Sequence, residues 1–273
     1  KGVTICQNKK EALDDINDIL QGKFETSKKA IIEEFLEGEE LSYFVITDGT
    51  NLKPIGNAQD HKKIWEGDTG LNTGGMGAYS PSILITRELE EKIIKKIIEP
   101  TLYAMKKIGC EYKGILYAGL MVKNNEPKLI EYNIRFGDPE CQVLMMRLNN
   151  DLLDLILSTF DNTLSLQKIL WKDENAITTV AVNHGYPEAY QKGKVIKNID
   201  LINQNNNQQL FHAGTKKNSE GEIIAVGGRV LNSTVTSKNL IQARDKSLEI
   251  LDKLDWENKF YRRDIAFKAI KNK

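Results

Sequence analysis

LIEYNIRFGDPE, residues 129–140, has the alternating pattern of a β-strand over most of its length. Because successive side chains of a strand point to opposite faces, its odd and even positions are predicted to form two different surfaces. The even positions, which read as core, are Ile130, Tyr132, Ile134 and Phe136. The odd positions, which carry a carboxylate, an amide and a guanidinium in succession, are Leu129, Glu131, Asn133 and Arg135.

The odd face has a simple interpretation as the solvated side of an ordinary strand, and the pattern alone leaves that interpretation open. Three features favour a binding role. The stretch ILYAGLMV (115–122) is almost wholly apolar, which indicates that it is a central strand. Glu131 and Asn133 offer two oxygen atoms in one direction, and Mg²⁺ prefers oxygen ligands. The strand then runs directly into RFGDPE (135–140), so an anion-binding arginine follows within one turn of chain.

Length and composition indicate a globular protein of one large domain or about two ordinary ones, since 40% of its 273 residues are hydrophobic. Its 38 basic residues balance 38 acidic ones, so no net field favours nucleic acid or an anionic membrane as a partner. The three cysteines, Cys6, Cys110 and Cys141, lack the spacing of metal sites or disulfide frameworks, which favours a reducing cytoplasm. The chain opens with Lys1 rather than Met and is expected to be part of a longer protein.

Periodicity predicts a chain that mixes helices and strands. Helices are predicted at 9–22, 87–109, 140–148, 151–160 and about 237–254, and strands at 3–6, 30–36, 41–48, 52–56, 114–122 and 127–133. Pro100 is expected to kink the second helix or to start a new segment. Asn124 and Asn125 are expected to join the last two strands in an antiparallel hairpin. Charged residues at 171–175 indicate a boundary before a β-rich unit.

Residues 57–82 contain five glycines and no sustained period of either kind. A structureless loop of this length is uncommon unless it is functional or disordered. Glycines let backbone N–H groups approach an anion closely, but the stretch GDTGLNTGGMG (67–77) matches neither a GxxxxGK[ST] nor a GxGxxG motif. A flexible loop and a phosphate-binding loop both remain open interpretations.

The stretch IIEEFLEGEE (31–40) also has two interpretations. It can form an exposed charged hairpin. Alternatively, the backbone near Leu36 pairs with an adenine edge, while Glu33 and Glu40 accept hydrogen bonds from the amino group and from ribose hydroxyls. Among the histidines, His184 and His212 are expected to be structural, and His61, next to the glycine-rich stretch, is evenly balanced between a structural and a functional role.

Several stretches together resemble the glycinamide ribonucleotide synthetase (phosphoribosylamine–glycine ligase) family of ATP-grasp enzymes, over essentially the whole chain. They are IIEEFLEGEELSYFVITDG, AQDHKKIWEGDTGLNTGGMGAYSP, LYAGLMV, LIEYNIRFGDPECQ, HAGT, GGRVL and YRRDIAFKA. The resemblance implies an α/β (α+β) ATP-grasp fold with mixed or antiparallel sheets, flanking helices and a smaller β-rich C-terminal domain. It implies part of the lid lobe at 1–48, the large catalytic lobe at 49–170 and the C-terminal domain at 171–273. The family's N-terminal domain would then be missing.

The resemblance also implies roles for individual residues. ATP contacts are implied for Lys1, Gly2, Glu33, Leu36 and Glu40, and magnesium ligation, with manganese as an alternative, for Glu131 and Asn133. Substrate contacts are implied for Asn72, Gly74, Gly75, Gly77, Arg135, Gly137 and Asp138. Catalytic roles near the transferred phosphate are implied for His61, Lys62, Asp68 and Arg135. The strand before Glu131 carries Ala118 and Gly119, where many ATP-grasp enzymes have a second metal-binding acid.

The implied function is ATP-dependent ligation of glycine to 5-phosphoribosylamine through glycyl phosphate. The products would be glycinamide ribonucleotide, ADP and phosphate, in the cytoplasmic synthesis of purines. The glycine-rich stretch is expected to close over the acyl phosphate. Expected partners are the two small-molecule substrates and the missing N-terminal domain, not nucleic acid or a membrane. The alternatives are another ATP-grasp carboxylate–amine ligase or carboxylase, and a noncatalytic nucleotide-binding module.

Overall fold

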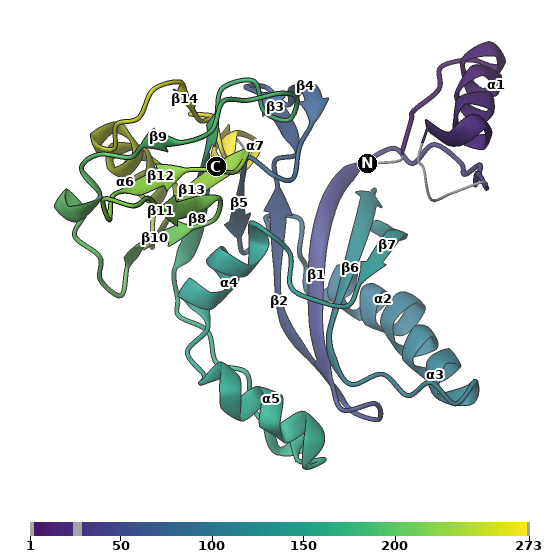
Figure 1. Cartoon of the computed structure of the whole chain (residues 1–273). Coiled ribbons are helices and arrows are strands. Elements are labelled where there is room, and N and C mark those ends of the chain that lie inside the picture. Colours follow the sequence, from purple (N-terminus) through teal and green to yellow (C-terminus); the bar gives the residue numbers. More distant parts are fainter. Residues whose placement is uncertain (1–2, 24–28, 272–273) are drawn as a thin grey trace. The chain divides into compact units, whose positions relative to one another are not determined.

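A computed structural model describes residues 3–23 and 29–271 of the chain (Figure 1). It divides into two compact units, Lys1–Gly38 and Glu39–Lys273. Lys1 and Gly2, for which the resemblance implies ATP contacts, lie outside the described residues. In the part of the chain that is described, no helix is both long and apolar enough to cross a membrane.

The described residues of the first unit contain the helix α1 (Lys9–Asp18), which a helical segment, η1 (Ile19–Lys23), extends. The Asn8 side chain caps it by accepting a hydrogen bond from the Glu11 N–H at 3.0 Å. Gly22 has a φ of +104°, which favours glycine and helps to end the segment. The predicted helix at 9–22 is therefore confirmed.

The two strands predicted in the first unit are wrong. Residues 3–6 and 30–36 form no strand, and Ile31 and Ile32 are 86% and 79% exposed. Their β-forming composition is not sufficient, because a strand also needs a partner for its backbone hydrogen bonds. Glu33 and Leu36, which the sequence assigns to the nucleotide, both lie in this irregular segment, and Glu33 is exposed.

The second unit is built on a sheet with the order β10-β13-β8-β5-β2-β1-β6-β7, to which β14 adds by pairing with β8 (Figure 1). All of its pairings between described strands are antiparallel. Strand β2 links its two halves, since it pairs with β1 and β5. The strands are β1 (Glu39–Thr47), β2 (Leu52–Asp60), β5 (Gly77–Ser80), β6 (Gly114–Lys123), β7 (Glu126–Asn133), β8 (Asn175–Asn183), β10 (Gln208–His212), β13 (Arg229–Ser237) and β14 (Lys259–Phe260).

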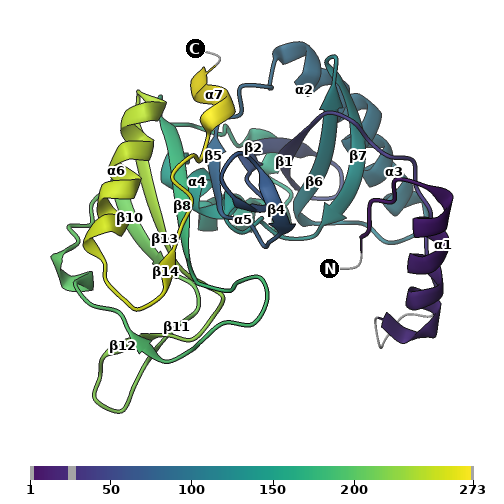
Figure 2. The ribbon, with the colours of Figure 1, turned by 90° about the horizontal axis from the view of Figure 1, so that it is seen from above.

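Helices cover this sheet and close three apolar cores. Figure 2 shows α6 along β8 and β13. Pro100 lies in the first turn of a new helical segment, α3 (Glu99–Lys107), as one of the two predicted alternatives had it, and its missing N–H costs little there. The helical segments are α2 (Arg87–Ile93), η2 (Ile94–Ile98), α3 (Glu99–Lys107), α4 (Glu140–Arg147), α5 (Leu152–Phe160), η3 (Leu164–Leu166), η4 (Ile199–Leu201), α6 (Leu240–Lys253) and α7 (Phe267–Lys271).

Two small sheets complete the second unit. One is a hairpin of β3 (Lys63–Trp65) and β4 (Thr69–Asn72). The other joins β9 (Lys194–Val195), β11 (Thr215–Lys217) and β12 (Ile223–Ala225). Residues 57–82 are therefore not one long loop, because they contain the end of β2, this hairpin and β5. Strands of three or four residues are too short to show a period in the sequence.

The hairpin of β6 and β7 confirms the predicted antiparallel pair. Asn124 and Asn125 have φ of +53° and +61°, which two-residue hairpin turns require. The prediction that Leu129 shares a face with Glu131 is wrong. Gly119 lies opposite Glu131, whereas its neighbour Leu120 lies opposite Leu129. Ile130 is thus the extra residue of a β-bulge.

The bulge at Ile130 changes which side chains share a face. Directly opposite residues share a face, and Leu120 belongs to the core beneath α2 and α3. Leu129 is therefore on the side of that core, opposite to Glu131. The predicted apolar face is also incomplete, since Tyr132 packs against the core but Ile130 and Ile134 are 39% and 76% exposed.

The predicted fold class, antiparallel sheets with flanking helices and a smaller β-rich C-terminal part, is confirmed. The domain boundaries at 48/49 and 170/171 stay predictions. At the second of these positions one sheet is continuous, because β5 pairs with β8 over four residue pairs that begin with Gly77 and Thr179.

Candidate active site

Three neighbouring strands place polar side chains on one face of the large sheet. Ser42 in β1 lies opposite Gly119 in β6, and Gly119 lies opposite Glu131 in β7. These residues share a face, because directly opposite positions do so. Positions two residues away share it too, which adds further candidate side chains. We call this set the polar face, and its members are Glu40, Ser42, Tyr117, Glu131 and Asn133.

Glu131 and Asn133, the predicted metal ligands, lie side by side on the polar face. Nδ2 of Asn133 donates to Oε1 of Glu131 at 3.2 Å. A half-turn of the amide would present its oxygen beside the carboxylate instead. A Cβ at Gly119 would lie 3.3 Å from the Glu131 side chain, so glycine keeps space there. Within the described ranges, no group of three or more His, Cys, Asp or Glu could hold a metal ion. The pair therefore fits a cation that draws its other ligands from phosphate or water.

Lys62 and Glu40, predicted for the phosphate and the ribose, are ion-paired with each other. Burial alone would lower the pKa of Lys62. The Glu40 carboxylate, with smaller contributions from Asp60 and Glu140, outweighs burial and raises the pKa. Lys62 is therefore a fixed positive charge beside the polar face.

A buried carboxylate and a half-buried one with a buried oxygen lie next to Lys62, and the sequence pattern did not single them out. Glu140 is 3% exposed and accepts a hydrogen bond from the Ser42 hydroxyl at 2.8 Å. Oδ1 of Asp60 has no hydrogen-bond partner among residues 3–23 and 29–271. Burial first, and then the Glu140 carboxylate, raise the pKa of Asp60 well above its usual value. In the sequence, these two residues are marked only by being acidic and by lying in the motifs QDHK and GDPE.

Glycines cover these two carboxylates. A Cβ at Gly75 would lie 2.6 Å from Oδ1 of Asp60, and a Cβ at Gly137 would lie 2.4 Å from Oε2 of Glu140. Both distances are too short for a side chain. Gly75 also has a φ of +111°, so its position requires glycine, whereas a side chain at Gly137 would force the Glu140 carboxylate to move.

Arg229, at the start of β13, joins the two predicted substrate segments. Its Nη1 donates to the carbonyl oxygens of Gly74 and Asp138, both at 2.7 Å, and its Nη2 donates to Oδ2 of Asp138 at 2.7 Å. The Gly74 N–H donates to the Tyr186 hydroxyl at 2.8 Å. In the sequence, Arg229 is visible only as an arginine after two glycines in GGRVL, and this pattern does not predict its contacts.

Arg135 has a different environment from Arg229. It is exposed, and its one hydrogen bond to another described residue runs from Nη1 to the Phe136 carbonyl oxygen at 2.8 Å. Its guanidinium thus keeps donors for a ligand. Asn72 is exposed in β4, opposite Lys63, whereas Gly77 is buried in β5. Lys62 contacts the polar face directly, through Glu40. Gly74 and Asp138 are brought together by Arg229, and Asn72 shares none of these printed contacts among the described residues.

His61 and Asp68 bind the C-terminal segment. His61 is 6% exposed, and its Nε2 accepts a hydrogen bond from the Ala266 N–H at 2.9 Å. The ring proton is then on Nδ1, which lies 3.1 Å from Oδ1 of Asp68. Asp68 also accepts from Arg262 at 2.9 Å and lies 3.2 Å from Lys268. Burial would raise the pKa of Asp68, but the His61 hydrogen bond and these cations lower it. Both side chains are fully engaged within the protein.

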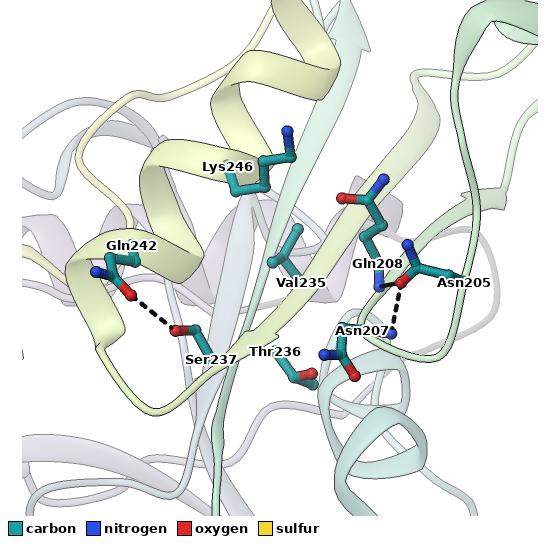
Figure 3. A pocket seen from close by; sticks show the side chains of 8 residues that line it. All are labelled: Asn205, Asn207, Gln208, Val235, Thr236, Ser237, Gln242 and Lys246. Atoms are coloured by element: carbon teal, nitrogen blue, oxygen red, sulfur yellow. Dashed lines mark hydrogen bonds between the residues drawn. The ribbon is translucent and has the colours of Figure 1, made fainter.

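A pocket of about 300 Å³ lies elsewhere, at β10, β13 and α6 (Figure 3). Its wall is mostly carboxamides and hydroxyls, and Gln242 accepts a hydrogen bond from the Ser237 hydroxyl at 3.3 Å. No predicted site residue lines it. Its lining residues are Asn205, Asn207, Gln208, Val235, Thr236, Ser237, Gln242 and Lys246.

Comparisons with known proteins agree with the resemblance of the sequence. The family model described as "Phosphoribosylglycinamide synthetase, ATP-grasp (A) domain" matches residues 1–141, and the model of that synthetase's C domain matches residues 176–268. A phosphoribosylamine–glycine ligase of Brucella melitensis is 47% identical over 99% of this chain and 63% of its own length. A chloroplastic one of Arabidopsis thaliana is 44% identical over 100% of this chain and 52% of its own length.

Solved structures give the same result for the fold. The crystal structure of the Thermotoga maritima phosphoribosylamine–glycine ligase matches with a TM-score of 0.87 and 33% identity, over 97% of this chain and 66% of that one. The biotin carboxylase domain of a thermophilic 2-oxoglutarate carboxylase, at 16% identity and a TM-score of 0.62, shares the fold. The chain spans about 63% of the length of the first of its curated relatives. The chain belongs to the phosphoribosylglycinamide synthetase family.

Proposed function

We propose that the protein containing this chain ligates glycine to 5-phosphoribosylamine with ATP, through glycyl phosphate. The products are glycinamide ribonucleotide, ADP and phosphate, in the de novo synthesis of purines. The observation that carries this proposal is the polar face, where Glu131 and Asn133 lie on one surface with Glu40, beside the cation of Lys62. The names of the relatives support the choice of substrates.

The chemistry explains why such a site suits this reaction. A carboxylate resists attack by an amine, because its oxide is a poor leaving group. When the carboxylate oxygen bonds to the γ-phosphorus of ATP, ADP leaves and glycyl phosphate forms. The amine then attacks the carbonyl carbon, and the C–O bond breaks to release that oxygen as part of phosphate. Phosphoryl transfer needs positioning and neutralisation of charge more than covalent help from the protein. Fixed cations, amides and close-packed glycines supply both.

We assign the metal site to Glu131 and Asn133, which would hold magnesium, with manganese as an alternative. Such an ion, when bound, supplies positive charge to the β- and γ-phosphates. We assign ATP contacts to Glu40, and to Lys1, Gly2, Glu33 and Leu36 from the resemblance. Lys62, whose pKa its acidic neighbours raise, holds positive charge for the transferred phosphate.

We assign the substrate site to the segments that Arg229 joins. Arg135 keeps guanidinium donors for two parallel hydrogen bonds to the carboxylate of glycine. The glycine-rich segment and residues 137–138 complete the substrate site. Its residues are Asn72, Gly74, Gly75, Gly77, Gly137 and Asp138. His61 and Asp68 act by positioning their neighbours, because their polar atoms already bind the C-terminal segment.

The rest of the polypeptide and its location belong to the same proposal. The relatives are longer than this chain, which supports a further N-terminal domain as an intramolecular partner. We retain 1–48, 49–170 and 171–273 as the lid part, the catalytic lobe and the C-terminal domain. The lack of paired cysteines supports the cytoplasm as its location.

Substrate dependence tests the proposal. The full-length protein with ATP and magnesium should form ADP only when glycine and freshly generated phosphoribosylamine are both supplied. Bicarbonate replaces glycine in a parallel reaction, because the shared fold extends to biotin carboxylase domains. ADP formation that follows bicarbonate would favour a carboxylase instead. A protein that binds ATP without any turnover would be a noncatalytic module.

Magnesium binding provides a second test, because the assigned metal site has only two protein ligands, Glu131 and Asn133. The full-length protein without nucleotide is expected to bind magnesium weakly, in the millimolar range, since phosphate oxygens would complete the shell. Adding ADP should tighten binding clearly. Titration calorimetry with and without ADP measures the difference. Micromolar affinity in the absence of nucleotide would show that other protein ligands exist, and would contradict the two-ligand assignment.

A further inference from the structure

We infer that Arg262, near the C-terminal end, is a positioning residue that sets the glycine-rich hairpin and Lys62 for catalysis. This inference rests on the proposed function for its catalytic consequence. Arg262 is 199 positions from Lys63 in sequence, yet the two are hydrogen-bonded. Arg262 itself is not among the residues that we assign to ATP, glycine or the metal. Its effect would therefore be indirect.

Arg262 is fully buried, with 0% exposure, and four hydrogen bonds hold its guanidinium. Nε and Nη2 donate to the two oxygens of Asp264, both at 2.7 Å. Nη1 donates to Oδ1 of Asp68 at 2.9 Å and to the Lys63 carbonyl oxygen at 3.0 Å. A buried guanidinium that loses such partners is costly. The position of Arg262 and the position of residues 63–68 are thus coupled.

Lys62 is held between this contact and a second one. On one side, Arg262 binds the carbonyl oxygen of Lys63. On the other side, the Lys62 carbonyl oxygen accepts hydrogen bonds from the N–H and the hydroxyl of Thr73, at 2.7 and 2.8 Å. His61 is fixed as well, since its N–H donates to Gly77 and its carbonyl oxygen accepts from Met76, both at 2.8 Å. Hydrogen bonds therefore hold the backbone at Lys62 and at both of its neighbours.

The tip of the β3–β4 hairpin rests on the same C-terminal segment. The Gly67 N–H donates to Oδ2 of Asp264 at 2.7 Å, and Oε1 of Glu66 accepts from the backbone N–H of Arg263 at 3.1 Å. The Trp65 ring meets the Phe260 ring edge-on, with centroids 5.1 Å apart. The hairpin is therefore arranged before any substrate arrives, and a closing movement of the kind expected from its glycines would have to break these contacts. Such pre-organisation is what a precise site needs.

The neighbouring arginine offers a matched control. Arg263 is 54% exposed in its side chain, which pairs with Asp252 at 2.9 Å. Its hydrogen bond to the hairpin, among the residues that the structure describes, comes from its backbone. Lysine at position 262 would keep the charge but could not form the same fork to Asp264 and Asp68. Both variants replace a guanidinium by an ammonium group. Arg262→Lys does so at a buried position, and Arg263→Lys does so at an exposed one.

The first measurement needs no substrate. Amide hydrogen exchange of the full-length protein is followed for peptides that cover residues 63–74. Arg262→Lys is expected to speed exchange there by about tenfold or more, because local opening becomes easier, while Arg263→Lys leaves it unchanged. Equal exchange in both variants and in the unsubstituted protein would overturn the inference.

The second measurement separates positioning from a loss of folded protein. In the ADP assay, Arg262→Lys is expected to raise the KM for glycine by about tenfold, because small misplacements near a reacting centre are costly. The KM for ATP should change by less than about twofold, since the four hydrogen bonds of Arg262 hold the hairpin backbone, Asp68 and Asp264, whereas Glu40 is paired with the flexible side chain of Lys62. A merely structural role would lower kcat alone, in proportion to the folded fraction, and that result would overturn the inference.

If Arg262→Lys does not fold, Asp264→Asn answers the same questions, because it keeps the side chain's size but removes one acceptor for Arg262 and Gly67. If the unsubstituted protein shows no turnover with glycine, the proposed function fails, and with it the predicted change in KM. The exchange experiment still decides whether Arg262 holds the hairpin.

Discussion

Replacing Glu131 with alanine is expected to abolish glycine-dependent ADP formation by the full-length protein. Glu131 supplies the only carboxylate of the proposed two-residue metal site, and Asn133 alone would be a poor ligand. Loss of charge stabilisation at a phosphoryl-transfer site is expected to lower kcat by about a thousandfold or more. The assay compares initial rates at saturating ATP, magnesium and glycine.

Glu126→Ala is the control for this experiment. Glu126 begins the same strand, β7, and is exposed, where it pairs with Lys92 and Lys96 at 2.6 and 2.9 Å. Surface ion pairs contribute little, so this variant should keep its activity. Near-normal turnover of Glu131→Ala would remove Glu131 from the metal site. A loss of activity in both variants would point to damage to the strand rather than to the site.

Arg135→Lys is expected to weaken the use of glycine more than the use of ATP. Lysine keeps the positive charge but cannot form two parallel hydrogen bonds with a carboxylate. The KM for glycine should rise by about tenfold, which corresponds to roughly 1.4 kcal/mol of lost binding. Because Arg135 is exposed and bonds only its neighbour's carbonyl group in the described chain, folding should be unaffected. Initial rates over a range of glycine concentrations measure the change.

The control for Arg135 is Arg87→Lys. Arg87 is 94% exposed in its side chain, on α2, and pairs only with Glu91 among the described residues. Its replacement should leave both KM values unchanged. If Arg135→Lys shows the same dependence on glycine concentration as the unsubstituted protein, the carboxylate of glycine binds elsewhere, and Arg229 becomes the next candidate.

The alternation of residues along one strand predicted the part of the site that lies on that strand. Alternation placed Glu131 and Asn133 on one face, and the pairing of β6 with β7 confirms it. The same alternation failed at Leu129, because a β-bulge depends on the partner strand and leaves no mark in the bulged strand itself. The strands predicted at 3–6 and 30–36 failed for a related reason, since strand composition does not supply a partner.

Long-range contacts account for what the sequence could not predict. Arg229 binds Asp138 from 91 positions away, and His61 accepts a hydrogen bond from Ala266, 205 positions away. Neither distance follows from the period of a helix or strand. Asp60 and Glu140 come together because two loops fold over them, with glycine where a side chain would collide. Such arrangements become visible only once the chain is folded.

The fate of one oxygen atom tests the central claim most directly. The full-length protein is supplied with ATP, phosphoribosylamine and glycine labelled with ¹⁸O in its carboxylate. If glycyl phosphate forms, one labelled oxygen becomes the bridge to phosphorus and leaves with phosphate. We expect mass spectrometry to find phosphate that carries a single ¹⁸O, in an amount equal to the glycinamide ribonucleotide formed. Product that appears together with unlabelled phosphate would contradict the account.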